Sequence, residues 1–140
     1  MEDYAVTPWE VKGNMDYDKL VRDFGTSYIE EDLLNKIKNH TGELHFMLRR
    51  KVFFSHRDLT WIINRYEAGE KFFLYTGRGP SGNTHLGHLL PWIFTQYLQE
   101  KFGVELYFQI TDDEKYMHDR SLTRKQVSDF SYENILDIIN

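Results

Sequence analysis

The sequence contains no cysteine, which excludes disulfide frameworks and zinc sites built on thiolates and suits a reducing compartment. It has only three prolines, and no apolar run approaches the length of a membrane-spanning helix. Basic residues are in the minority, because 17 lysines and arginines stand against 22 aspartates and glutamates. This balance excludes a free-standing polybasic nucleic-acid binder. We therefore expect a soluble, cytoplasmic protein.

The first half of the chain is dominated by helical patterns. Its first fourteen residues look irregular, with Pro8, Trp9 and Gly13 among them. Apolar residues at helical spacing then predict three helices, each followed by a glycine, in residues 16–24, 27–41 and 55–68. Ser27 with Glu30 fits a capping box at the start of the second helix. Residues 1–70 are therefore expected to form a helical N-terminal segment.

The pattern changes at Lys71. The run KFFLYT, residues 71–76, is typical of a buried strand, and VELYFQI, residues 104–110, alternates apolar and polar residues as a second strand does. A helix is expected between them, with Pro91 in its first turn, where a missing N–H is harmless, and Gly103 at its end. Strand, helix and strand together match the size of a βαβ unit, so the two strands should be parallel.

The last helical pattern begins at a capping box of Thr123 and Gln126 and continues to the final residue without a stop signal. One βαβ unit is half of a doubly wound sheet at most, and its strand edges would be unpaired. We therefore expect an α/β fold in which residues 71–140 form part of a longer parallel sheet. The alternative is a small, complete α+β domain.

The stretch YTGRGPSGNTHLGHLLPW, residues 75–92, joins the first strand to the helix. Open α/β sheets bind ligands at such turns, and a helix N-terminus attracts anions. GRGPSG is neither a P-loop nor a dinucleotide fingerprint. Arg78 offers a charge that can grip phosphate, while His85 and His88 bracket Gly87 and offer two hydrogen-bond donors. Gly87 leaves a flat space where a purine can lie, so the turn predicts a nucleotide site.

His85 and His88 allow two other interpretations. Taken alone, H-x-G-H fits a flexible loop with two helix-capping histidines, because a four-residue motif often occurs by chance. The strand before it, the helix after it and the clustered glycines favour the nucleotide site. A metal site is disfavoured, since no carboxylate or cysteine lies close in sequence to complete one.

TGRGPSGNTHLGHLLPW followed by QITDDEKY resembles the class I aminoacyl-tRNA synthetases, and more narrowly the tryptophanyl-tRNA synthetases of archaea and eukaryotes. Residues 85–88 stand where that class carries its HIGH signature. DYDKLVRDFGTSYI and LRRKVFFSHRD resemble the segment ahead of the catalytic sheet, so the resemblance covers nearly the whole chain from Trp9 onward. It implies a Rossmann-like (HUP-type) nucleotide-binding catalytic domain, with residues 71–140 as its first half and residues 1–70 packing on it.

The resemblance implies a tryptophan–tRNA ligase, which activates L-tryptophan with ATP to tryptophanyl-adenylate and transfers it to tRNA(Trp). Mg²⁺ accompanies the ATP, and a homodimer is expected. The residues that match ATP contacts of the family are Arg78, Gly79, Pro80, His85, Gly87 and His88. His85 and His88 are the expected catalytic pair. Tyr75 and Gln109 match residues that hydrogen-bond the indole N–H, and Glu114 matches the carboxylate that takes the amino group.

These substrate roles also make chemical sense. The indole N–H is only a donor, so its site needs an acceptor such as the Tyr75 phenol oxygen or the Gln109 amide oxygen. Both should lie at the carboxyl edge of neighbouring strands and face one pocket. The plainer interpretation is that both are ordinary polar strand ends and that DDEK, residues 112–115, is a solvated turn.

Two features of the class are absent from the sequence: the lysine-rich KMSKS loop and the anticodon-binding domain. We therefore expect the chain to be the N-terminal portion of such an enzyme. The alternatives are a tyrosyl-type class I synthetase, which shares the fold and H-x-G-H, and a catalytically incomplete synthetase-like module that binds nucleotide.

Overall fold

The computed structural model describes residues 5–6, 11–12 and 16–140, so the predicted irregular residues Pro8, Trp9 and Gly13 lie outside the described part. The chain divides into two compact units, Met1–Asn64 and Arg65–Asn140. The division falls within one helix, between Asn64 and Arg65.

The first unit consists of short helices and very short strands. Its elements are β1 (Ala5–Val6), β2 (Val11–Lys12), α1 (Tyr17–Asp23), β3 (Ser27–Tyr28), α2 (Glu31–Thr41), α3 (Phe46–Arg49), β4 (Ser55–His56) and the start of α4 (Leu59–Glu67). β1 pairs with β2 and β3 with β4, both antiparallel. Apolar side chains at helical spacing are buried, for example Leu33 and Ile37 on α2, which is the packing that the sequence pattern predicts.

Two predicted helix starts in this unit are wrong. Ser27 and Ser55 lie in paired strands, β3 and β4, and the helices begin several residues later. Glu30 is the N-cap of α2 and makes no side-chain capping bond. At α4 the Leu59 amide donates to Nδ1 of His56 at 3.1 Å. The backbone pairing of the two strands thus displaces the local capping box.

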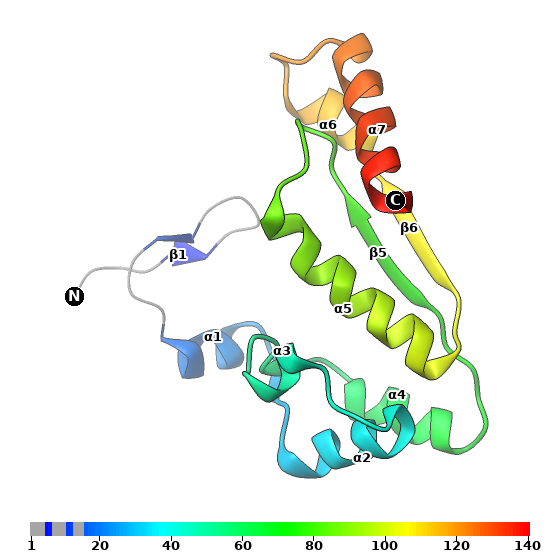
Figure 1. Cartoon of the computed structure of the whole chain (residues 1–140). Coiled ribbons are helices and arrows are strands. Elements are labelled where there is room, and N and C mark those ends of the chain that lie inside the picture. The colour runs from blue at the N-terminus through cyan, green and yellow to red at the C-terminus, as the bar shows by residue number, and fades with distance from the viewer. Residues whose placement is uncertain (1–4, 7–10, 13–15) are drawn as a thin grey trace. The chain divides into compact units, whose positions relative to one another are not determined.

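The second unit contains the parallel pair that the sequence predicts. After the end of α4 its elements are β5 (Leu74–Arg78), α5 (Leu86–Phe102), β6 (Leu106–Ile110), α6 (Asp112–His118) and α7 (Arg124–Ile139). β5 and β6 lie side by side and parallel, in register from Leu74 opposite Leu106 to Arg78 opposite Ile110 (Figure 1). The α/β fold, with part of a Rossmann-like parallel sheet after a helical segment, is therefore confirmed.

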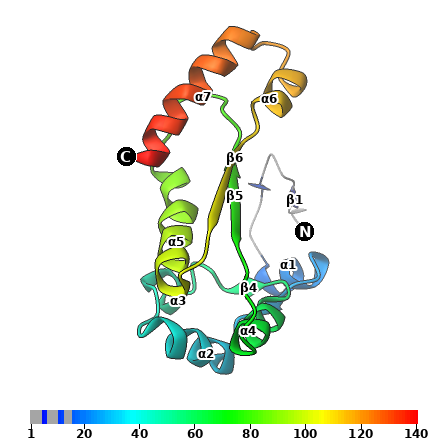
Figure 2. The same ribbon diagram turned by 90° about the vertical axis from the view of Figure 1, so that its right-hand side faces the viewer.

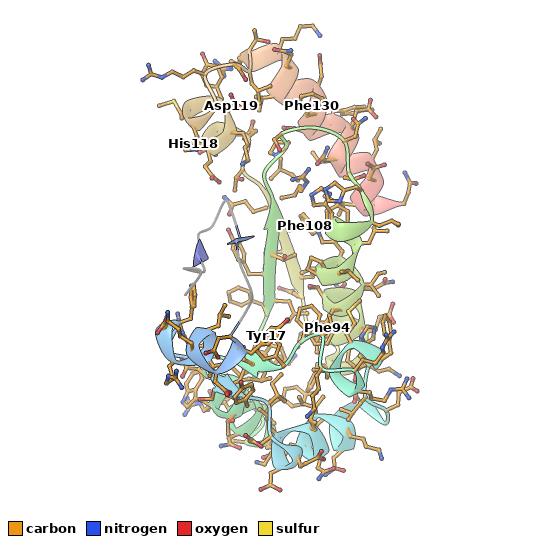
Figure 3. All side chains as sticks on the ribbon, turned by 90° about the vertical axis from the view of Figure 1, so that its left-hand side faces the viewer. Tyr17, Phe94, Phe108, His118, Asp119 and Phe130 are labelled. Atoms are coloured by element: carbon orange, nitrogen blue, oxygen red, sulfur yellow. The ribbon has the colours of Figure 1, made fainter. Side chains whose placement is uncertain are left out.

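The helices of this unit cover the β5–β6 pair unevenly. Figure 2 shows α5 and α7 on the same side of the two strands. Trp92 of α5 meets Phe108 of β6 edge to face, with ring centroids 5.5 Å apart, and Phe108 is labelled in Figure 3. The strands alternate half-buried and exposed positions, as the predicted pattern requires. One face of the pair is therefore packed and the other is open within this unit.

Two local predictions differ from the structure, and so does the plainer interpretation of residues 112–115. The first strand begins at Leu74, not at Lys71, and runs on to Arg78. Helix α5 begins before His88, so Pro91 lies inside the helix beyond its first turn. Proline has no N–H, and the Gly87 carbonyl therefore lacks the helical donor four residues on. The DDEK segment belongs to helix α6 and is not a turn.

The remaining end signals are confirmed. Gly103 ends α5 in the left-handed conformation, with φ of 62°, and Thr123 with Gln126 forms the capping box of α7. Over the residues described here, no helix combines the length and the hydrophobicity needed to cross a membrane.

Candidate active site

The start of α5 is built by His85 and His88. His85 is the N-cap residue, and its Nδ1 accepts the Gly87 amide at 3.2 Å, while Nδ1 of His88 accepts the His85 amide at 3.0 Å. The ring centroids are 3.7 Å apart. Because each Nδ1 accepts, the neutral imidazole carries its proton on Nε2. Both histidines therefore offer an Nε2–H donor at the N-terminus of a long helix.

The environment of His88 favours its neutral form. Burial lowers the pKa of His88 below its ordinary value, and the positive charge of Arg78 and the neighbouring His85 lower it further. The His88 ring also stacks near Trp92, with centroids 6.1 Å apart and 21° between the planes. The effect of Arg78 on this pKa shows that its charge acts on the same turn.

Arg78, the last residue of β5, is held by two neutral groups. Its Nε donates to Oδ1 of Asn134 at 3.0 Å and its Nη1 donates to the carbonyl of Gly79 at 2.7 Å. Partial burial lowers the pKa of the guanidinium, which stays charged at any physiological pH. Within the described residues the guanidinium makes these two hydrogen bonds, which leaves further N–H donors for a ligand.

Two glycines of the turn lie close to neighbouring side chains. A Cβ at Gly79 would meet Cε of Lys115, the far end of a flexible side chain that can move aside, and Pro80 beside Gly79 is fully buried. A Cβ at Gly87 would lie 3.0 Å from Cε1 of His85. The His85 imidazole therefore borders the space above Gly87 that the sequence assigns to a purine.

Asn134 on α7 is a residue of this site that the sequence interpretation missed. Its side chain is 0% exposed and its Nδ2 donates to the carbonyl of Gly82 at 2.9 Å. Thr84 hydrogen-bonds Asp137 of the same helix. The available signal was its spacing, because Asn134 stands seven residues after the buried Val127 and so shares its face of the helix.

The residues predicted to hold tryptophan are less closely assembled. Tyr75 is the second residue of β5 and not its end, and it lies opposite Tyr107, while Gln109 lies opposite Gly77. Tyr75 and Gln109 thus share the open face of the pair, and Tyr75 is 64% exposed. Glu114 is exposed on α6, which follows β6 directly. Within residues 65–140 the three side chains are therefore not enclosed in one pocket.

Gly77 explains how the two strands approach on that face. A Cβ at this position would lie 2.8 Å from the backbone oxygen of Gln109. Such a contact is too short for any side chain, and both partners are backbone in the sheet. Glycine is therefore required at residue 77 for the observed pairing.

Across the described ranges, no three acidic, histidine or cysteine side chains are close enough together to hold a metal ion. The turn offers hydrogen-bond donors from Arg78, His85 and His88, which suit phosphate oxygens. Its chemistry is that of an anion site.

Protein-family models give no match to the chain. The curated tryptophan–tRNA ligase of Saccharolobus solfataricus is 59% identical over 138 residues, which cover 99% of this chain and 36% of that protein. The ligase of Pyrococcus horikoshii is 56% identical over 140 residues, with the same two shares of 99% and 36%. The chain thus spans about a third of the length of these relatives.

Solved structures show the same relationship. The tryptophanyl-tRNA synthetase of Plasmodium falciparum matches with a TM-score of 0.86 and 44% identity, over 89% of this chain and 35% of that one. That of Trypanosoma brucei matches with a TM-score of 0.83 and 49% identity, over 89% and 38%.

Proposed function

Because this chain is homologous to about a third of the length of the tryptophanyl-tRNA synthetases, we propose that it forms the nucleotide-binding part of a tryptophan–tRNA ligase. Such an enzyme activates L-tryptophan with ATP and transfers the tryptophanyl group to tRNA(Trp). The family resemblance read from the sequence is confirmed by these matches. Their coverage agrees with the prediction that the chain corresponds to the N-terminal portion.

The observation that carries this function is the pair of imidazoles at the start of α5. Both use Nδ1 to accept a backbone amide, so both Nε2–H groups serve as donors to phosphate oxygens. Arg78 adds a charge at the same turn. In our proposal His85 and His88 are the catalytic pair, and ATP contacts also include Arg78, Gly79, Pro80 and Gly87.

The reaction needs no side-chain nucleophile. A carboxylate oxygen of tryptophan attacks the α-phosphorus, the bond from that phosphorus to the bridging oxygen breaks, and pyrophosphate leaves with the electron pair. Negative charge on the transferring phosphoryl oxygens is stabilised by the fixed N–H donors of the turn. Because these donors are held by the fold, no reorganisation is required when charge develops.

Mg²⁺ would enter with ATP as its phosphate complex, where it neutralises charge on the leaving pyrophosphate. Arg78, His85 and His88 supply N–H donors, so these side chains fit the phosphate oxygens and not the metal ion itself. The chain's own contribution is to hold the phosphate oxygens with Arg78, His85 and His88.

The amino-acid half of the site is proposed on the sequence match. Tyr75 or Gln109 would accept the indole N–H, and Glu114 would pair with the ammonium group. Support comes from the shared face of Tyr75 and Gln109 and from the position of α6 directly after β6. The same proposal includes residues 1–70 packing on the catalytic domain, a homodimer, and a cytoplasmic location.

The test is tryptophan-dependent exchange of labelled pyrophosphate into ATP, measured on the natural full-length protein that carries this sequence. Exchange is expected with tryptophan and not with tyrosine, and it should fall on removal of either imidazole by His85→Ala or His88→Ala. Lys125→Gln is the matched control, because Lys125 is exposed and, among the residues that the structure describes, its ammonium pairs only with Asp129 on α7. Exchange with tyrosine alone would indicate the tyrosyl-type enzyme, and ATP binding without exchange would indicate the incomplete module.

A further inference from the structure

Asn134 joins two parts of the nucleotide turn that are far apart from it in sequence. Its Oδ1 accepts Nε–H of Arg78, 56 residues earlier, and its Nδ2 donates to the carbonyl of Gly82, 52 residues earlier. Resting on the proposed function, we propose that Asn134 is a positioning residue, which aims the Arg78 guanidinium at the bound phosphates and fixes the turn around them.

The first support is that the Asn134 side chain is buried and that both its amide oxygen and its amide nitrogen are hydrogen-bonded. Asn134 is 0% exposed, and the described residues contain no buried side-chain nitrogen or oxygen without a hydrogen-bond partner. An amide in such a position can only be retained if both of its ends are bonded, because an unsatisfied buried polar group is costly. Its rotamer and amide orientation are therefore fixed by two different elements, β5 and the turn.

The second support is the charge balance. A carboxylate at residue 134 could accept the same Nε–H, but it would neutralise the guanidinium that is needed for phosphate. An amide oxygen orients Arg78 and leaves its charge available. Both protein partners of Arg78, Asn134 and the Gly79 carbonyl, are neutral, as this role requires.

The third support is that α7 carries a second contact to the same turn. Thr84, just before His85, hydrogen-bonds Asp137, which lies one helical turn after Asn134. The segment from Arg78 to Thr84 is thus tied to α7 at three points, through its first residue, Gly82 and Thr84. Of Asn134 and Asp137, Asn134 is the one that hydrogen-bonds Arg78. Because Arg78 is a proposed phosphate contact, a change at Asn134 should also affect ligand binding.

The experiment compares three α7 variants in the natural protein. Asn134→Leu removes both bonds. Asn134→Asp keeps the acceptor for Arg78, but it replaces the Nδ2 donor to the Gly82 carbonyl by a carboxylate oxygen and adds a charge. Ser131→Ala is the matched control. In the described part of the chain the Ser131 hydroxyl donates only to the Val127 carbonyl, inside the helix. The readouts are the ATP dissociation constant, the Nε–H resonance of Arg78, and amide hydrogen exchange in residues 79–84.

Asn134→Leu should weaken ATP binding by about tenfold, move the Arg78 Nε–H resonance and speed exchange in the turn. Asn134→Asp should keep the Nε–H resonance protected. It should still weaken ATP binding, because the new carboxylate competes with the phosphates for Arg78, and it should speed exchange in the turn, because the bond to the Gly82 carbonyl is lost. Ser131→Ala should leave all three readouts unchanged. If Asn134→Leu does not fold, Asn134→Asp carries the test, since it has nearly the same shape.

Failure of this inference and failure of the proposed function give different results. If the native protein binds ATP and Asn134→Asp binds it equally well, with unchanged exchange in the turn, the positioning role is wrong while the function stands. If the native protein does not bind ATP, the proposed function fails. The inference, which rests on it, then fails as a ligand-positioning role, even if the Nε–H resonance and turn exchange still change.

Discussion

The nucleotide half and the amino-acid half of the candidate site differ in how much of them the chain builds by itself. Arg78, His85 and His88 each have hydrogen-bond partners that fix their orientation. Tyr75 and Gln109 lie on an open strand face, and Tyr75 is 64% exposed. The candidate anion site is therefore held by hydrogen bonds within residues 78–88 and α7, whereas the proposed indole acceptors Tyr75 and Gln109 are exposed.

The physical reason lies in what each half requires. An anion site needs backbone amides, a helix start and a few polar side chains, and short-range hydrogen bonds can hold all of these. A pocket for an indole needs apolar walls on several sides, and two strands cannot supply them. Phe73 and Tyr107 beside Tyr75 are 62% and 53% exposed, although their rings meet each other at 5.4 Å. The open face therefore carries aromatic side chains that remain largely exposed.

The largest expected effect is at Gly77, which lies between the two halves. In Gly77→Val the new Cβ would lie only 2.8 Å from the backbone oxygen of Gln109. Neither strand can move away without breaking the pairing. We expect a loss of stability of about 3 kcal/mol and loss of both halves together. Urea unfolding followed by circular dichroism measures the change.

Gly82→Ala is the matched control for Gly77→Val. No atom lies within 4 Å of a Cβ at Gly82, and the carbonyl that accepts from Asn134 is retained. Its stability should stay within about 0.5 kcal/mol of the native protein. Equal stability of both glycine variants would contradict the strand pairing on which the comparison of the two halves rests.

The next largest effect is expected from Arg78→Ala, which should impair the nucleotide half and leave the amino-acid half nearly unchanged. Arg78→Ala removes the charge at the turn and should weaken ATP binding by about tenfold to a hundredfold, because charge-assisted hydrogen bonds to phosphate are lost. Tryptophan binding should change little, since Arg78 lies on the packed face of β5 and Tyr75 on the open one. Calorimetric titration with each ligand measures both. Equal losses for the two ligands would mean that the halves form a single coupled unit.

A smaller effect is expected from the pH dependence of His88. Its pKa is lowered below 6.5 in the folded protein, so between pH 6.5 and that lower value the unfolded chain binds more protons. The stabilisation is therefore fully present above pH 6.5 and is lost as the pH falls below it. Protonation of Nδ1 also removes the acceptor for the His85 amide. Histidine ring titration by NMR and unfolding at several pH values measure this.

His88→Asn serves as the control for that titration. An amide oxygen at about the place of Nδ1 still accepts the His85 amide, and it does not titrate in this pH range. The loss of stability below pH 6.5 should be smaller in this variant. A His88 pKa at or above 6.5 in the native protein would contradict the crowding of Arg78 and His85 around it.

The sequence predicts the fold best where the pattern and the local chemistry agree. The alternation in residues 104–110 places Phe108 on the packed face and Gln109 on the open one, as observed. The end signals at Gly103 and at Thr123 act through neighbouring backbone groups. Such short-range effects can be read from one segment alone.

The errors arise where a distant segment decides the outcome. Ser27 is drawn into a strand by its pairing with His56, which no local pattern shows. The Arg78 guanidinium donates a hydrogen bond to Asn134, 56 residues away, which no local pattern shows either. In both cases a partner distant in sequence, and not the local pattern, decides the structure.

The start of α5 is a different kind of error, because it is set locally. Hydrogen bonds of His85 and His88 cap the helix, so Leu86 already belongs to it and Pro91 lies inside it.

The smallest effect tests the open half directly. Tyr75→Phe removes a phenol oxygen from a residue that is 64% exposed, so the stability of this chain should change by less than about 0.5 kcal/mol. ATP affinity should be unchanged, because the nucleotide half is fixed by its own hydrogen bonds. In the natural full-length protein, however, the proposed indole acceptor would be lost, and KM for tryptophan should rise by about tenfold. A marked loss of stability in the 140-residue chain would show that the open face is already packed, and the contrast between the halves would then disappear.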